Sequence, residues 1–166
     1  MLRFSNDLQA YAVGRRVNSE EWNARTFTMA AASAATRLGF GVPVMPGNGR
    51  NTCVELDATT GRVFLGVTEA VPTLPRPGDD PTLGGAFARY DEVPVDEIAV
   101  LAVKVIGNTT KNAVARWDTV AKAWTAAAQS ATVVTLPGVT FEETATAPGI
   151  SPIRIRRPNP ALSVSG

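Results

Sequence analysis

Paired carboxylates are the residues of this sequence whose spacing could support chemistry, because two acids held together can act as general acid and base. The pairs are Glu20-Glu21, Asp79-Asp80, Asp91-Glu92, Asp96-Glu97 and Glu142-Glu143. Neighbouring residues of a strand point to opposite faces, so none of these pairs is a ready two-carboxylate site. Acidic side chains are mostly exposed in folded proteins, and we therefore predict that the pairs lie in solvated turns.

Other common catalytic groups are scarce. The chain of 166 residues has no histidine and a single cysteine, which leaves out the commonest general base, an internal disulfide and a Cys-cluster zinc site. That cysteine, Cys53, stands between Thr52 and Val54 and is predicted to be a buried strand thiol. Residues 47–50 lack the Lys-Ser/Thr ending of a phosphate loop and predict a hairpin turn instead. We expect no catalytic residue, no metal and no cofactor.

Charge gives no bulk attraction to anionic partners, since 16 basic and 15 acidic residues leave a net charge of +1. We therefore expect no direct nucleic-acid binding. We also expect no membrane association, because no apolar stretch approaches membrane-spanning length, and synthesis in a cytoplasm, because the first residues are too polar for a signal peptide. One basic cluster stands out, Arg154, Arg156 and Arg157. Without interleaved aromatics it is weak evidence for nucleic acid, and a protein partner's acids or a solvated strand edge explain it as well.

The element that must organise the fold is Ile98–Ile106, in which Lys104 is the only polar residue. As a strand it would be apolar on both faces, which is typical of a strand buried between two layers. Its Val and Ile content and the following Gly107-Asn108 turn favour strand over helix. We predict that it is the central strand of one β-rich domain.

The rest of the chain, with 12 Pro and 14 Gly between short apolar runs, predicts many turns and short strands. The expected strands lie at 25–29, 40–45, 53–56, 62–67, 86–90, 113–118, around Trp124, at 133–142 and at 150–155. Strands 53–56 and 62–67 are expected to form a hairpin, 30–38 is left open between helix and loop, and the Pro-rich 72–85 is expected to be a long loop. The fold class is all-β, a small β-sandwich or barrel-like domain over residues 24–156, with an extended N-terminal arm at 1–23 and a C-terminal tail at 157–166.

The first 23 residues show no clean period, yet they contain Phe4, Tyr11 and Trp22. A frayed terminus rarely carries three large aromatic residues. We therefore favour an arm that becomes ordered by lying on another surface.

Several segments together resemble the structural cement, or decoration, proteins of tailed bacteriophage heads. They are Ala24-Arg25-Thr26-Phe27, 40–44, 62–68, Tyr90 with Val93-Pro94-Val95, the central strand, 115–118 and 136–141. Their order and spacing cover most of residues 24–156. The resemblance implies a non-enzymatic virion protein that binds the outside of the phage head, bridges neighbouring major capsid protein subunits and stabilises the expanded capsid.

Under this resemblance the arm and the basic end are the expected contacts with the capsid. The predicted capsid-binding residues are Phe4, Tyr11, Arg15, Arg16, Trp22, Arg154, Arg156 and Arg157. Neighbouring copies of the protein are a second expected partner, as a dimer or trimer, because strand edges and arms invite pairing. Deletion of residues 1–22 is expected to leave a folded domain that no longer binds capsids.

A ligand-binding module is the alternative from another functional class. It would use Tyr90, Trp117 and Trp124 as a platform on which a carbohydrate or another ligand stacks. Packing of these aromatics in the core is the competing interpretation, and we favour it because large aromatic side chains are usually buried.

Overall fold

The longest strand, β7 (Glu92–Val105), runs through the middle of the protein in a computed structural model that describes residues 12–18, 22–31, 33, 36–59, 61–71, 86–146 and 148–156. Its residues from Val93 onward are buried or half-buried apart from Lys104, which confirms the predicted central strand. The strand begins earlier than expected, because Pro94 lies inside it rather than in a turn. A proline fits there because the registered pairing of β7 with the neighbouring strand β5 (Gly66–Thr68) ends at Val95, and beyond it Pro94 takes part only as an acceptor, from Glu69 N–H to Pro94 O at 2.9 Å.

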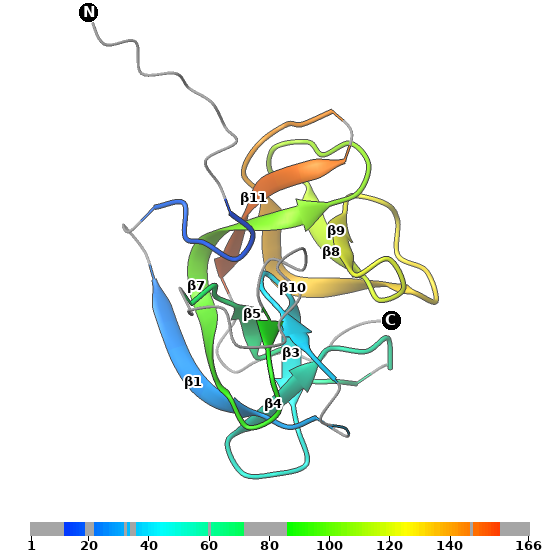
Figure 1. Cartoon of the computed structure of the whole chain (residues 1–166). Coiled ribbons are helices and arrows are strands. Elements are labelled where there is room, and N and C mark those ends of the chain that lie inside the picture. Colours follow the sequence, from blue (N-terminus) through cyan, green and yellow to red (C-terminus); the bar gives the residue numbers. More distant parts are fainter. Residues whose placement is uncertain are drawn as a thin grey trace, which may run out of the picture.

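Hydrogen-bonded pairing closes two circuits that share β7 (Figure 1). The N-terminal ring joins β1 (Asn23–Met29), β4 (Thr52–Glu55), β3 (Pro43–Pro46), β5 and the first half of β7. The C-terminal ring joins the second half of β7 to β11 (Gly149–Arg156), β10 (Val133–Phe141), β8 (Val114–Asp118) and β9 (Ala123–Thr125). The all-β prediction is confirmed, and its architecture is barrel-like.

Two hydrophobic clusters fill the rings. The C-terminal ring surrounds the larger cluster, in which Trp117 and Trp124 pack edge to face with their ring centroids 5.7 Å apart. Leu56, Phe64 and Val67 join this cluster from the N-terminal half of the chain, so the core continues across the junction. The smaller cluster belongs to the N-terminal ring and consists of Phe27, Met29, Leu38, Val44, Cys53, Phe87, Val93 and Val95.

The predicted hairpin between 53–56 and 62–67 is wrong. The strands β4 and β5 do not pair with each other, because β3 lies between them and pairs antiparallel with both. The turn at 47–51 therefore makes the hairpin, from β3 to β4. The short polar connection between β4 and β5 in the sequence favoured pairing of these two strands. In the structure the short β3 makes the hydrogen bonds to both of them.

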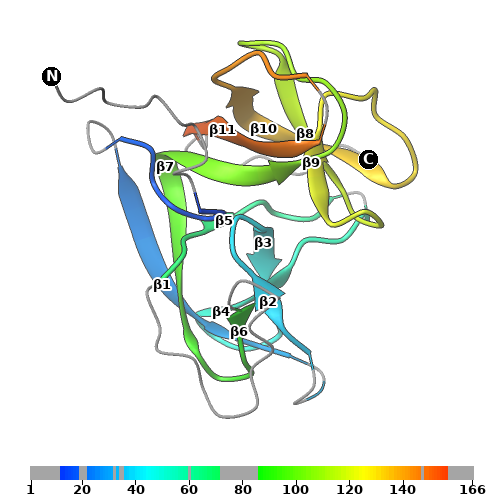
Figure 2. The same ribbon diagram turned by 45° about the horizontal axis from the view of Figure 1, so that its top comes forward.

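The predicted strand at 86–90 is reduced to β6 (Ala86–Phe87), which pairs with β2 (Leu38–Gly39) in a separate small sheet (Figure 2). Tyr90 does not continue the strand, because its φ of 71° puts it in the left-handed region of a turn. The segment between β1 and β2 shows no helix in its described residues. The Pro-rich 72–85 lies outside the described residues.

Candidate functional site

A short segment of the predicted arm lies on β7. This strap, residues 12–18, bonds to β7 through Gly14 N–H to Ala102 O at 2.7 Å and Val17 N–H to Val100 O at 2.8 Å. Gly14 has a φ of +80°, and a Cβ at this position would lie 2.6 Å from the Cβ of Phe40. The local sequence can follow this path because glycine tolerates both the left-handed conformation and the close approach.

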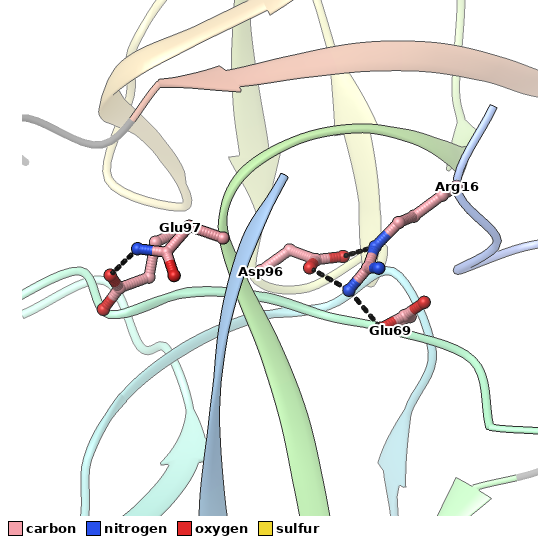
Figure 3. Close-up of polar contacts among 5 residues, drawn as sticks. Arg16, Glu69, Asp96 and Glu97 are labelled. Carbon is pink, nitrogen blue, oxygen red and sulfur yellow. Dashed lines mark hydrogen bonds and ion pairs between the residues drawn. The ribbon is translucent and has the colours of Figure 1, made fainter. Parts of the chain in front are cut away.

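The strap brings Arg16 to the junction of the two rings, between two carboxylates (Figure 3). The Arg16 Nη2 atom lies 2.8 Å from Asp96 Oδ1 on β7 and 2.7 Å from Glu69 Oε2, just after β5. The Asp96 side chain is fully buried. Burial raises the pKa of Asp96, and the Arg16 guanidinium opposes that shift only in part. The pKa of Glu69 is raised by its burial and by the charge of Asp96.

Glu97 points to the other face of β7 (Figure 3). It accepts a hydrogen bond from Asn23 Nδ2 at 3.2 Å and pairs with Arg25 at 3.1 Å. The opposite orientation of Asp96 and Glu97 confirms that the two carboxylates do not form one site. The prediction that they lie in a solvated turn is wrong, because this pair is inside a strand and both residues are buried.

Trp22 is the large exposed side chain beside this junction, with 57% of its surface accessible. The guanidinium of Arg16 lies 4.3 Å from the centre of its ring, which is a cation–π distance. Arg16 thus connects buried Asp96 to an exposed indole. Arg15 is exposed on the same strap.

The basic end of the chain reaches the same part of β7. Asn23, at the beginning of β1, and Arg156, at the end of β11, are both paired with Ile98. Arg156 and Asn23, the neighbour of Trp22 in the sequence, therefore lie on the two sides of β7 at the same residue. Arg156 is exposed, whereas Arg154 is half-buried and pairs with Glu142 through Nη2 at 3.0 Å from Oε2. This contact lowers the pKa of Glu142.

Three of the predicted contacts, Phe4, Tyr11 and Arg157, lie outside the described residues. Among the residues that the structure does describe, no three potential ligands cluster as a metal site would require, and no helix is long and apolar enough to cross a membrane.

The stacking platform of the alternative function does not form. Trp117 and Trp124 are buried in the C-terminal ring, and Trp124 donates from Nε1 to Gly41 O at 2.7 Å. Tyr90 is exposed in a turn beside β1. The competing interpretation, core packing, is confirmed for both tryptophans. The ligand-binding module loses the surface on which it rested.

Comparison with known proteins decides the family. A model of the family described as structural cement protein (E217 gp24/Pam3 gp6) matches residues 3–156. This chain belongs to that family. A solved structure titled "The capsid of Myoviridae Phage XM1" contains a chain with the same fold, at a TM-score of 0.66 and 14% identity, covering 93% of this chain and 98% of that one. No curated protein matches the chain.

Membership of the structural cement family makes this a structural, non-enzymatic protein of the phage virion. The arginine–carboxylate cluster accordingly has a structural role, and sequence reasoning missed it. One signal was available, because Asp96 lies within an almost continuous apolar run from Val93 to Val105. Glu69 gave no comparable signal, since only the fold brings it to Arg16.

Proposed function

We propose that this cement protein binds the outside of the phage head, bridges neighbouring major capsid protein subunits and stabilises the expanded capsid. The observation that carries the proposal is that β1 and β11 flank Ile98 on the two sides of β7, within a family of structural cement proteins. Residues from both ends of the described chain then contact the capsid from one region of the protein. Because the two rings share β7, a force applied by one capsid subunit is passed through the fold to the next subunit.

The proposed contacts are the eight predicted residues, Phe4, Tyr11, Arg15, Arg16, Trp22, Arg154, Arg156 and Arg157. Tryptophan, tyrosine and arginine are the residues that most often dominate binding energy at protein interfaces. Trp22 fits this role because it is exposed and held against Arg16. Arg16 acts mainly by holding Trp22, since two carboxylates already occupy its guanidinium.

Repetition makes modest contacts sufficient. When one protein touches two subunits, its second contact forms at a high effective concentration, and many copies act on one shell. Neighbouring copies of this protein, as dimers or trimers, would add further contacts. Synthesis in the host bacterial cytoplasm and assembly on the outer surface of the head complete the proposal.

The test is co-sedimentation of the purified protein with undecorated phage heads, combined with survival of the heads on heating and at low salt. We expect saturable binding and improved survival. Protein that stays in the supernatant at saturating concentration would contradict the proposal.

A truncated variant, compared with a point variant as control, tests whether the first residues contact the capsid. Deletion of residues 1–11 should preserve the fold and weaken binding, whereas deletion of 1–22 also removes Arg16 and is no longer a clean test. Val120→Ala is the matched control, because Val120 is exposed in the turn between β8 and β9. Binding that survives deletion of 1–11 unchanged would remove Phe4 and Tyr11 from the contact surface.

A further inference from the structure

Within the described part of the chain, the first half of β1 is paired along one edge, and we call its other edge the open edge. Along one edge it pairs with β7 from Asn23 to Thr28. On the other edge its partner is β4, and that pairing covers Thr28 and Met29. Figures 1 and 2 show β1 at the outside of the molecule, with no other described strand beside its first half on the side away from β7.

Backbone hydrogen bonds show which groups point to the open edge. Met29 N–H donates to Asp91 O, toward β7, whereas Thr28 N–H donates to Asn51 O, away from it. Because these groups alternate along a strand, the N–H and C=O of Ala24 and the N–H of Thr26 point away from β7. Thr26 O already accepts a hydrogen bond from Asn51 Nδ2 at 3.2 Å, so the open edge ends at Thr26 in the direction of the C-terminus.

The side chains beside this edge differ on the two faces of β1. Arg25 is on the face of Phe27 and Glu97, and 65% of its side chain is exposed. Trp22 precedes the strand on the opposite face, where Arg16 and Asp96 lie. An added strand would therefore meet a guanidinium on one face and an indole on the other.

We infer that the open edge of β1 at Ala24–Thr26 accepts an extended segment of the major capsid protein as an additional strand. The segment would place an acidic side chain against Arg25 and an apolar one against Trp22, which strand alternation allows. This inference rests on the proposed function and specifies how the capsid is held. Backbone pairing supplies affinity, and the two side-chain contacts supply register.

Thr26→Pro tests the edge, because it removes an N–H that points away from β7 and leaves the β7 ladder intact. Thr26→Val is the matched control, since it changes the side chain and keeps the N–H. In co-sedimentation with undecorated heads, we expect Thr26→Pro to bind about tenfold more weakly or worse, as loss of backbone hydrogen bonds predicts, and Thr26→Val to bind like the wild type.

Hydrogen–deuterium exchange of the wild-type protein gives a second readout that needs no variant. The amides of Ala24 and Thr26 should exchange more slowly on heads than in free protein, while the exposed turn at 119–122 should not change. Equal binding by Thr26→Pro, or unchanged exchange of these two amides in head-bound protein, would overturn the inference and leave the proposed function intact. Failure of the wild type to bind heads would instead reject the proposed function.

The mass of the free protein, measured by sedimentation, tests whether a second copy of this chain occupies the open edge instead. A lower mass for Thr26→Pro than for the wild type would show that a second copy of this chain occupies the edge, and would overturn the assignment to the capsid protein.

Discussion

The two halves of β7 face different interiors. In the C-terminal ring the inward residues Ala99, Leu101, Val103 and Val105 are all apolar. In the N-terminal ring Val93 and Val95 are followed by the buried carboxylates of Asp96 and Glu97. One strand thus passes from an ionic environment to an apolar one over a few residues.

The difference shows two ways of closing a small β ring. The C-terminal ring closes around tryptophans and aliphatic side chains, which Leu56, Phe64 and Val67 from the N-terminal half of the chain complete. The N-terminal ring has a smaller core, uses the strap and Arg16 to neutralise a buried charge, and pairs β4 with β1 only at Thr28 and Met29 among the described residues. We therefore expect packing to dominate the stability of the C-terminal ring and charge compensation to dominate the stability of the N-terminal ring. The N-terminal ring also carries most of the proposed contacts that the structure describes.

The largest expected effect is on the apolar ring. Trp124→Ala removes a fully buried indole, its edge-to-face partner contact and its hydrogen bond to Gly41 O. Urea unfolding should show a loss of about 4 kcal/mol. Val120→Ala, in the adjoining turn, should change stability by less than about 0.5 kcal/mol. Similar losses for both variants would contradict the packing interpretation.

The next effect tests charge compensation at the other ring. Arg16→Ala leaves the buried Asp96 carboxylate without its ion-pair partner, and we expect a loss of about 3 kcal/mol. Arg154→Ala breaks a pair nearer the surface and should cost about 1 kcal/mol. Both are measured by urea unfolding at neutral pH.

A double variant separates charge from packing. Adding Asp96→Asn to Arg16→Ala removes the uncompensated charge and should recover part of the loss. If the single variants at Arg16 and Arg154 cost the same, or the double variant recovers nothing, the contrast between the two sites is wrong.

Acid should act on the two sites in opposite directions. Arg154 lowers the pKa of Glu142, so this site's stabilisation is present above the ordinary glutamate pKa and is lost as the pH falls through the lowered value. Burial raises the pKa of Asp96, so the cost of its charge is present at neutral pH and is relieved as the pH falls through the raised value. Urea unfolding from about pH 7 to pH 3 measures both.

Two variants isolate these contributions. Glu142→Gln should flatten the acid end of the stability profile, because the titrating group is gone. Asp96→Asn should make the unfolding free energy fall more steeply as the pH is lowered toward the ordinary aspartate pKa. The reason is that the variant lacks the stabilisation that protonation of Asp96 gives the wild type in this pH range. The same change in both variants would contradict the opposite signs.

The smallest effect concerns the turn that leads into β7. Tyr90 is exposed and left-handed, and a bulky residue costs about 1 kcal/mol there. Tyr90→Gly should therefore raise the unfolding free energy by less than about 1 kcal/mol, since the lost Arg89 contact offsets part of the gain. Tyr90→Ala keeps the strain and should not stabilise, so equal effects of the two would exclude strain as the cause.

Elements with strong local patterns could be predicted from the sequence. The apolar run at 98–106, the alternation at 25–29 and the Ile153/Ile155 face opposite Arg154 all match the structure. Buried Cys53 was predicted too, and burial raises its pKa to about 11. In each case the local pattern and the burial agree.

Long-range relations could not be predicted in this way. The order β4–β3–β5 depends on which short strand lies in the middle, and neighbouring segments of similar composition do not specify that. The Arg16–Asp96–Glu69 cluster joins residues separated by 80 and 53 positions along the chain. Only closure of the ring brings these side chains together, so no window of sequence could show it.

Sharing of β7 by both rings also has a mechanical consequence. If the rings are pulled apart along this strand, its flanking hydrogen bonds are loaded in shear, and several must break together before either ring slides. Peeling from an edge would break them one after another at a much lower force. A protein built around such a strand should yield abruptly at a high force, and the yield point should lie where Asp96 meets Val67 and Ala24 on its two sides.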